Sequence, residues 1–188
     1  MSMMIAGLLL FTGTHLFLAL ASDCVEGLRR RFGPLAVKAA VSLLSLAGLT
    51  LIVLGWKSTQ PQWLYQPPTG LRHVAATLIV VAIYLFVVAQ RPSRIKRVLR
   101  HPQLTGVVLW AIAHLMLNGD SHSLLLFGVL ALWAVLEIML LNARDGAWVR
   151  ADAPPLATDI VTAVVTVVVV AVLVWAHPWY TGMAVLPG

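Results

Sequence analysis

The sequence has little charge and almost no cysteine. Only 11% of its 188 residues are charged and Cys24 is its single cysteine, whereas soluble domains are about 25% charged. One cysteine excludes an intrachain disulfide, a Cys-x-x-Cys metal site and the Cys-x-x-Cys-His attachment of a c-type haem. The chain also has no Ser-His-Asp set, phosphate loop or metalloprotease motif, so these classes of hydrolase find no support.

Apolar residues, by contrast, make up 60% of the chain, and the mean hydropathy is +0.91. A helix that spans a bilayer needs about 20 mostly apolar residues. The sequence therefore predicts an all-α, polytopic membrane protein, with six transmembrane helices in one bundle and a single domain over residues 1–188. The predicted spans are 3–21, 36–55, 71–89, 103–118, 122–141 and 158–177.

The distribution of lysine and arginine predicts how the chain is oriented. The segments after the first, third and fifth spans hold four, five and two of them, and the other side has only Lys57 and Arg72. The positive-inside rule then predicts a bacterial inner-membrane protein with both termini on the periplasmic side. Trp56, Trp63 and Tyr65 are predicted interfacial anchors on that side.

The formal charge of +6 is explained by this topology, and we expect no nucleic acid partner. Membrane lipids are the expected partners of the basic segments. The stretch "CVEGLRRRFG" in particular is predicted to lie along the inner surface, with its arginines facing lipid phosphates.

Ionisable side chains within spans are expensive and are functional hypotheses by default. His15 lies in "FTGTHLFLAL", with Thr12 about one turn before it. His114 shares a helix face with three residues at four-residue spacing, namely Gly106, Trp110 and Asn118. A neutral imidazole in apolar surroundings is a good iron ligand, and a haem needs such a slot with one or two histidines. The alternative for each histidine is a buried neutral ring, hydrogen-bonded within the bundle.

The remaining polar residues near span ends leave alternatives open. His101 and Glu137 share a depth, so Arg100 and His101 form a polar pocket with Glu137, unless Glu137 pairs with Arg144 or a loop arginine. Gly106 permits close approach of either a partner helix or a planar ligand. His122 and His177 are expected to be solvated or interfacial.

The stretch "RHPQLTGVVLWAIAHLMLNGDSHSLLLFGVLALWAVLE" closely resembles the NnrU family, as do "GTHLFLAL" and "LRHVAATLIVVAIYLFVVA". The resemblance covers about residues 5–142. Bacterial NnrU members are associated with nitrite and nitric oxide reduction, and a relative is 15-cis-zeta-carotene isomerase. The resemblance to that isomerase implies haem b, with iron ligated by His15 and His114, and cis–trans isomerisation of a linear carotene that enters from the lipid phase. The isomerase has a cysteine where this chain has Ala111, so a thiolate ligand is not implied.

The depths of the histidines raise one question about this ligand pair. At 1.5 Å per residue, His15 lies about 18 Å from the outer end of its predicted span and His114 about 6 Å from the end of its own. His73 is closer in depth to His114 and is therefore the alternate ligand. An electron donor and a second copy of the chain stay open as partners.

Two other readings of the function differ in class. One is a non-catalytic haem-binding accessory factor for denitrification. The other is an S-adenosylmethionine-dependent membrane methyltransferase, because "RHPQLTG" resembles the motif of the isoprenylcysteine carboxyl methyltransferase group. Arg100, His101, Pro102 and Gly106 match that motif, but Leu104 stands where the group has tyrosine.

Overall fold

The computed structural model describes residues 1–150, 152–182 and 185. In this part of the chain the regular structure is helical, and the connecting loops contain one isolated β-bridge between Trp63 and Asp120. The prediction of an all-α membrane bundle is confirmed. The helices are α1 (Ser2–Leu20), α2 (Ser22–Phe32), α3 (Pro34–Lys57), α4 (Arg72–Ala89), α5 (Pro102–Leu115), α6 (Ser121–Asp145) and α7 (Leu156–Thr181), with 3-10 turns η1 (Thr69–Leu71) and η2 (Arg94–Arg97).

Five of the six predicted spans are helices long and apolar enough to cross a membrane, and α5 is the short exception. Its 14 residues rise about 21 Å, less than the hydrocarbon thickness of about 30 Å. α5 begins at Pro102, a favourable first helical residue. It ends at Leu115 rather than at the predicted 118, because the chain turns there before α6 begins at Ser121.

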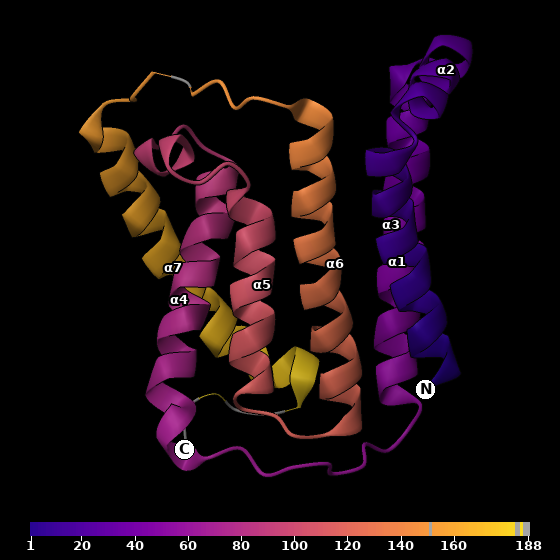
Figure 1. The fold of residues 1–188 in the computed structure, drawn as a ribbon. Coiled ribbons are helices and arrows are strands. Elements are labelled where there is room, and N and C mark those ends of the chain that lie inside the picture. The colour runs from indigo at the N-terminus through magenta and orange to yellow at the C-terminus, as the bar shows by residue number, and fades with distance from the viewer. Residues whose placement is uncertain (151, 183–184, 186–188) are drawn as a thin grey trace.

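The helices pack side by side in the spatial order α3, α1, α6, α5, α4, α7 (Figure 1). α1 and α3 pack most closely, since a Cβ on Gly7 would come within 2.6 Å of the Gly48 carbonyl oxygen. Such small residues let helix backbones approach in a bilayer, where packing rather than water exclusion drives association. α1 and α5 each pack on α6, which lies between them.

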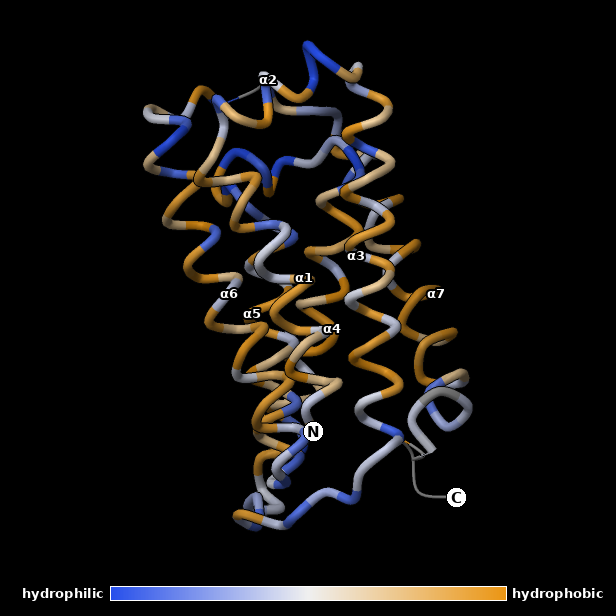
Figure 2. The backbone as a smooth tube through the Cα atoms, turned by 90° about the vertical axis from the view of Figure 1, so that its right-hand side faces the viewer, coloured by the Kyte–Doolittle hydropathy of each residue, from blue (hydrophilic) through white to orange (hydrophobic). Residues whose placement is uncertain are grey.

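The basic segments lie together at one end of the bundle, here called the basic end and made of residues 22–32, 90–101, 146–150 and 152–155 (Figure 1). The N-terminus, the segment 58–71 and the turn 116–120 lie at the opposite end. Figure 2 shows apolar residues along the helices between these more hydrophilic ends. This arrangement matches the predicted alternation of loops, and the membrane face that each end meets stays a prediction.

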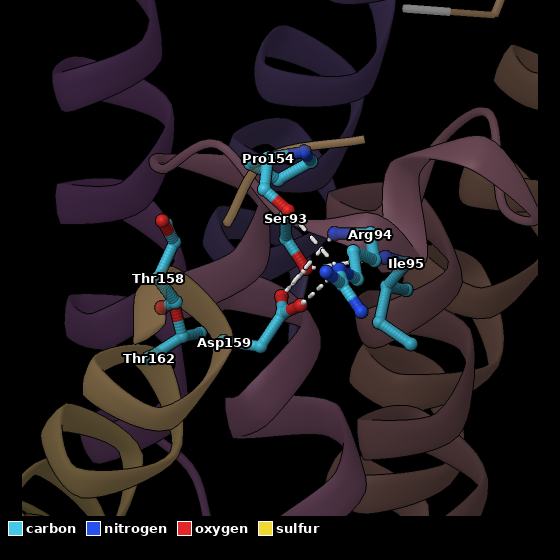
Figure 3. A network of polar contacts seen from close by, with 7 residues as sticks. All are labelled: Ser93, Arg94, Ile95, Pro154, Thr158, Asp159 and Thr162. Atoms are coloured by element: carbon cyan, nitrogen blue, oxygen red, sulfur yellow. Dashed lines mark hydrogen bonds and ion pairs between the residues drawn. The ribbon is translucent and has the colours of Figure 1, made fainter. Parts of the chain in front are cut away.

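The start of α7 is tied to the η2 segment by the network of Figure 3. A carboxylate oxygen of Asp159 accepts hydrogen bonds from the Ser93 hydroxyl (2.7 Å) and the Arg94 backbone N–H (3.2 Å). The Arg94 guanidinium donates to the Pro154 carbonyl oxygen (3.0 Å) and lies 3.8 Å from Asp159. Asp159 therefore has a structural role at the basic end.

Candidate functional site

His15 and His114 have the same local hydrogen bond. Nδ1 of His15 lies 2.9 Å from the Phe11 carbonyl oxygen, and Nδ1 of His114 lies 2.8 Å from that of Trp110. A carbonyl oxygen only accepts, so Nδ1 must carry the proton and donate it. In a neutral ring Nε2 then keeps its lone pair, which is the form in which a histidine ligates a metal. Both side chains are half-buried.

The histidines at 73, 101 and 122 are arranged differently. Nε2 of His101 bonds the side chain of Asn142 (3.0 Å), and Nε2 of His122 bonds the hydroxyl of Thr59 (2.8 Å). His122 is only 1% exposed, so the prediction of a solvated or interfacial His122 is wrong; the ring is held between α3 and α6. His73 is exposed in the first turn of α4, and no contact with His114 is described for it.

His114 lies in a cluster of aromatic rings from α5 and α6. Its ring stacks on Phe127 with centroids 4.5 Å apart and lies 4.7 Å from the ring of Trp110, which in turn meets the edge of Phe127. His177 of α7 is within electrostatic range of His114. Trp110 is therefore an immediate neighbour of the imidazole, as the four-residue spacing predicts.

The "NGD" turn fixes the end of the helix that carries His114. The Asn118 amide donates to the His114 carbonyl oxygen (2.9 Å), so Asn118 closes the last turn of α5. Asp120 is the N-cap of α6 and accepts from two backbone N–H groups there. Gly119 between them is buried against Tyr65, whose carbonyl oxygen leaves no room for a Cβ.

The sequence predicts Tyr65 only as an interfacial anchor and does not reveal its role at the end of α5. Its hydroxyl lies within hydrogen-bond distance of the carbonyl oxygens of Leu115 and Asn118, which the end of a helix leaves without partners. The segment 58–68 thereby covers the end of α5 that lies away from the basic end. No motif marks Tyr65, since its partners are backbone atoms 50 or more residues away.

His15 lies in a different environment, at the α1–α6 interface. Its ring centroid is 4.6 Å from that of Phe11 and 5.4 Å from that of Trp133 of α6. Glu137, only 7% exposed, is within electrostatic range of His15. The Trp133 Nε1 and one Glu137 carboxylate oxygen are buried, and although these two side chains lie close to each other on α6, neither atom has a hydrogen-bond partner at the usual distance and angle.

The expected pocket of Arg100, His101 and Glu137 does not form. Arg100 donates to the Gly146 carbonyl oxygen (2.8 Å) and His101 bonds Asn142, so both tie the start of α5 to the end of α6. The Arg144 guanidinium pairs with Asp145 at 2.7 Å, although Glu137 is within electrostatic range of it. The Arg-His-Pro segment therefore links the start of α5 to the end of α6 by hydrogen bonds.

Gly106 and Thr12 are packing residues in this arrangement. A Cβ on Gly106 would lie 3.0 Å from the Ala82 carbonyl oxygen and 3.1 Å from the Phe86 ring, so the close approach is that of helix α4. The buried hydroxyl of Thr12 donates to the Leu8 carbonyl oxygen (2.8 Å) of its own helix.

The model of one protein family, described as NnrU protein, matches residues 3–185 of this chain. The chain belongs to the NnrU family. The match covers nearly the whole chain, including the sixth span, which the resemblance at 5–142 did not reach. Neither the comparison with curated proteins nor that with solved structures finds a match.

The two imidazoles of this NnrU protein reach α6 at different heights. His15 contacts Trp133 and His114 contacts Phe127, six residues earlier on the same helix, which is about 9 Å along the axis. Axial nitrogens on one iron atom would be about 4 Å apart, twice a metal–imidazole bond of about 2 Å. The donor chemistry of each histidine fits haem iron, but the two rings as they lie do not converge.

Proposed function

We propose that this NnrU protein binds haem b through His114, with His15 as the second imidazole, and acts as a redox-dependent cis–trans isomerase of a linear carotene. The observation that carries the haem proposal is the shared hydrogen bond of His15 and His114, which leaves Nε2 of each ring with a lone pair inside the membrane. The isomerase activity rests on the resemblance to 15-cis-zeta-carotene isomerase.

His114 is the better-held ligand of the two. Its ring orientation is set by the Trp110 carbonyl oxygen and by stacking on Phe127, and its helix end is closed by Asn118. A bound haem would supply a one-electron redox centre. The lipid-facing helices expose apolar side chains, so an apolar polyene can approach from the bilayer without crossing water.

Because His15 and His114 contact α6 at different heights, ligation by one imidazole and ligation by both make different demands on the helix packing. Ligation by His114 alone needs no shift of α1 relative to α5. Ligation by both imidazoles needs α1 and α5 to shift relative to each other along α6, because their contact residues there are about 9 Å apart.

The test is the absorption spectrum of the detergent-purified full chain, oxidised and then reduced, with and without added haemin. We expect a Soret band that His114→Ala removes, lowering haem affinity at least tenfold. With His15→Ala we expect the band to remain and to shift to that of a single-imidazole haem. His101→Ala is the control, since its Nε2 is engaged with Asn142, and it should bind haem as the wild type does.

Colourless protein that does not respond to haemin would contradict the haem proposal. Isomerase activity is tested separately, by incubating the reduced haem-loaded protein with a 15-cis linear carotene and separating the isomers by chromatography. A normal haem spectrum without isomerisation would leave the accessory role in nitrite and nitric oxide reduction as the better account.

A further inference from the structure

A long apolar groove lies between α1, α2 and α3, on the far side of α1 from the histidine site. Its volume is about 540 Å³, and its lining includes Gly13, Phe17, Leu28, Phe32, Val37 and Ala40. Gly13 and Phe17 each lie two residues from His15, hence about 160–200° around the helix from it. The one polar side chain in the lining, Thr14, has its hydroxyl bonded to the Leu10 carbonyl oxygen (2.6 Å).

The length and the apolar lining of the groove suit an acyl chain of a lipid. On α1 it runs from Leu9 to Leu18, about 14 Å, which is close to half of a hydrocarbon core about 30 Å thick. The groove therefore spans one leaflet, at the basic end.

Arginines of α2 lie beside one end of the groove. Arg29, Arg30 and Arg31 occupy the last turn of α2, which lies beyond the ends of α1 and α3 in Figure 1. Glu26 is the carboxylate near them, 3.8 Å from Arg29 and 3.9 Å from Arg30. The Arg31 guanidinium lies 5.2 Å from the ring of Phe32, itself a lining residue. The three arginines outnumber the two carboxylates of α2, Asp23 and Glu26, so this helix carries a net positive charge at the basic end.

We propose that the groove binds one anionic phospholipid, with an acyl chain between α1 and α3 and its phosphate at the arginines of α2. The apolar lining accounts for the chain and the arginines account for the charge of the headgroup, because each basic residue near a membrane surface favours an anionic lipid by about fivefold. The site is separate from the histidines, so it does not rest on the proposed haem function.

The test uses paired glycine variants of the full chain. Gly13 lines the groove and Gly128 lies on α6, and a Cβ at either meets nothing within 4 Å. Gly13→Leu should fill the groove and Gly128→Leu should not. We expect native mass spectrometry of wild type and Gly128→Leu, released from micelles with phosphatidylglycerol, to show one retained lipid, and Gly13→Leu to retain at least fivefold less.

The headgroup contacts are tested by Arg29, Arg30 and Arg31 all replaced by Gln. We expect wild type to prefer phosphatidylglycerol over phosphatidylcholine by more than tenfold, and this variant to retain both lipids equally. Equal retention by Gly13→Leu and wild type would overturn the proposal, as would a wild type without preference between the two lipids. Co-purification of an uncharged polyene in the groove, or a dimer that Gly13→Leu dissociates, would also overturn it.

Discussion

The surroundings of His114 and His15 differ in how completely their polar atoms are paired. Around His114 the helix end is closed by the Asn118 amide and the Tyr65 hydroxyl, and the turn beyond it is capped by Asp120. Around His15 the Trp133 Nε1 and one oxygen of Glu137 are buried without partners. Both rings nevertheless carry the same hydrogen bond to the carbonyl four residues earlier.

This difference predicts that the two regions contribute unequally to the stability of the fold. Buried polar groups are nearly always paired in folded proteins, and those that are not call for an explanation. The polar groups around His114 are paired, so a substitution that removes one of these hydrogen bonds should lower the free energy of unfolding. Near His15, the Trp133 Nε1 and one Glu137 oxygen lack a hydrogen bond, so these two atoms should contribute little to the stability of the fold.

The largest effect on stability is expected from Gly119→Ala. The added methyl group would overlap the carbonyl oxygen of Tyr65, and overpacking of this kind costs about 3 kcal/mol. Thermal unfolding in detergent measures it, with Gly128→Ala as the control, because a Cβ there meets nothing within 4 Å. Equal stability of the two variants would remove the distinction between the regions.

Tyr65→Phe should have the next largest effect. It leaves the carbonyl oxygens of Leu115 and Asn118 without the hydroxyl, at an expected cost of about 1.5 kcal/mol, the upper end of the net value of a hydrogen bond. Tyr84→Phe is the matched control, since no hydrogen bond of the Tyr84 hydroxyl is found in the described part of the chain. The free energy of unfolding, measured by chemical denaturation, should be lower for Tyr65→Phe than for Tyr84→Phe. An unchanged stability of Tyr65→Phe would show that the turn 116–120 does not depend on the Tyr65 hydroxyl.

His101→Ala should lower the free energy of unfolding by about 1 kcal/mol, the usual net value of one hydrogen bond, because the imidazole bonds Asn142.

Calorimetry on the wild-type protein with S-adenosylmethionine tests whether the Arg-His-Pro segment is an interhelical contact or a cofactor site. Since Arg100 and His101 are engaged with α6, we expect no binding heat. Saturable binding that His101→Ala weakens would instead favour the methyltransferase reading.

The smallest effect is expected from Glu137→Met. One Glu137 oxygen has no hydrogen bond at the usual geometry, and the neighbours of the carboxylate are Trp133, His15 and Arg144 at longer range. Replacing such a buried polar group by an apolar one of similar size is nearly neutral or stabilising, so the free energy of unfolding should change by less than about 0.5 kcal/mol. Unfolding curves that show a loss as large as that of Tyr65→Phe would mean that Glu137 has a stabilising partner and that the two regions are alike.

Much of the fold followed from local sequence patterns. Apolar runs gave the spans, and the short segment between "RHP" and "NGD" was recognisable as a short span. The intramembrane placement of His15 and His114, and the helix face shared by His114 and Trp110, followed from spacing alone. His122 was misjudged because its partner, Thr59, is 63 residues away and no local pattern points to it.

The sequence by itself determined the membrane class and the placement of the two histidines on apolar helices, because hydropathy and helical spacing act over short stretches of chain. The family followed from the resemblance of its motifs. Tertiary structure alone decided that Tyr65 closes the end of α5, that Arg100 and His101 bind α6, and that His15 and His114 reach α6 at different heights. These contacts depend on how neighbouring helices are shifted along one another, and side chains and backbone carbonyls far apart in the sequence set that shift.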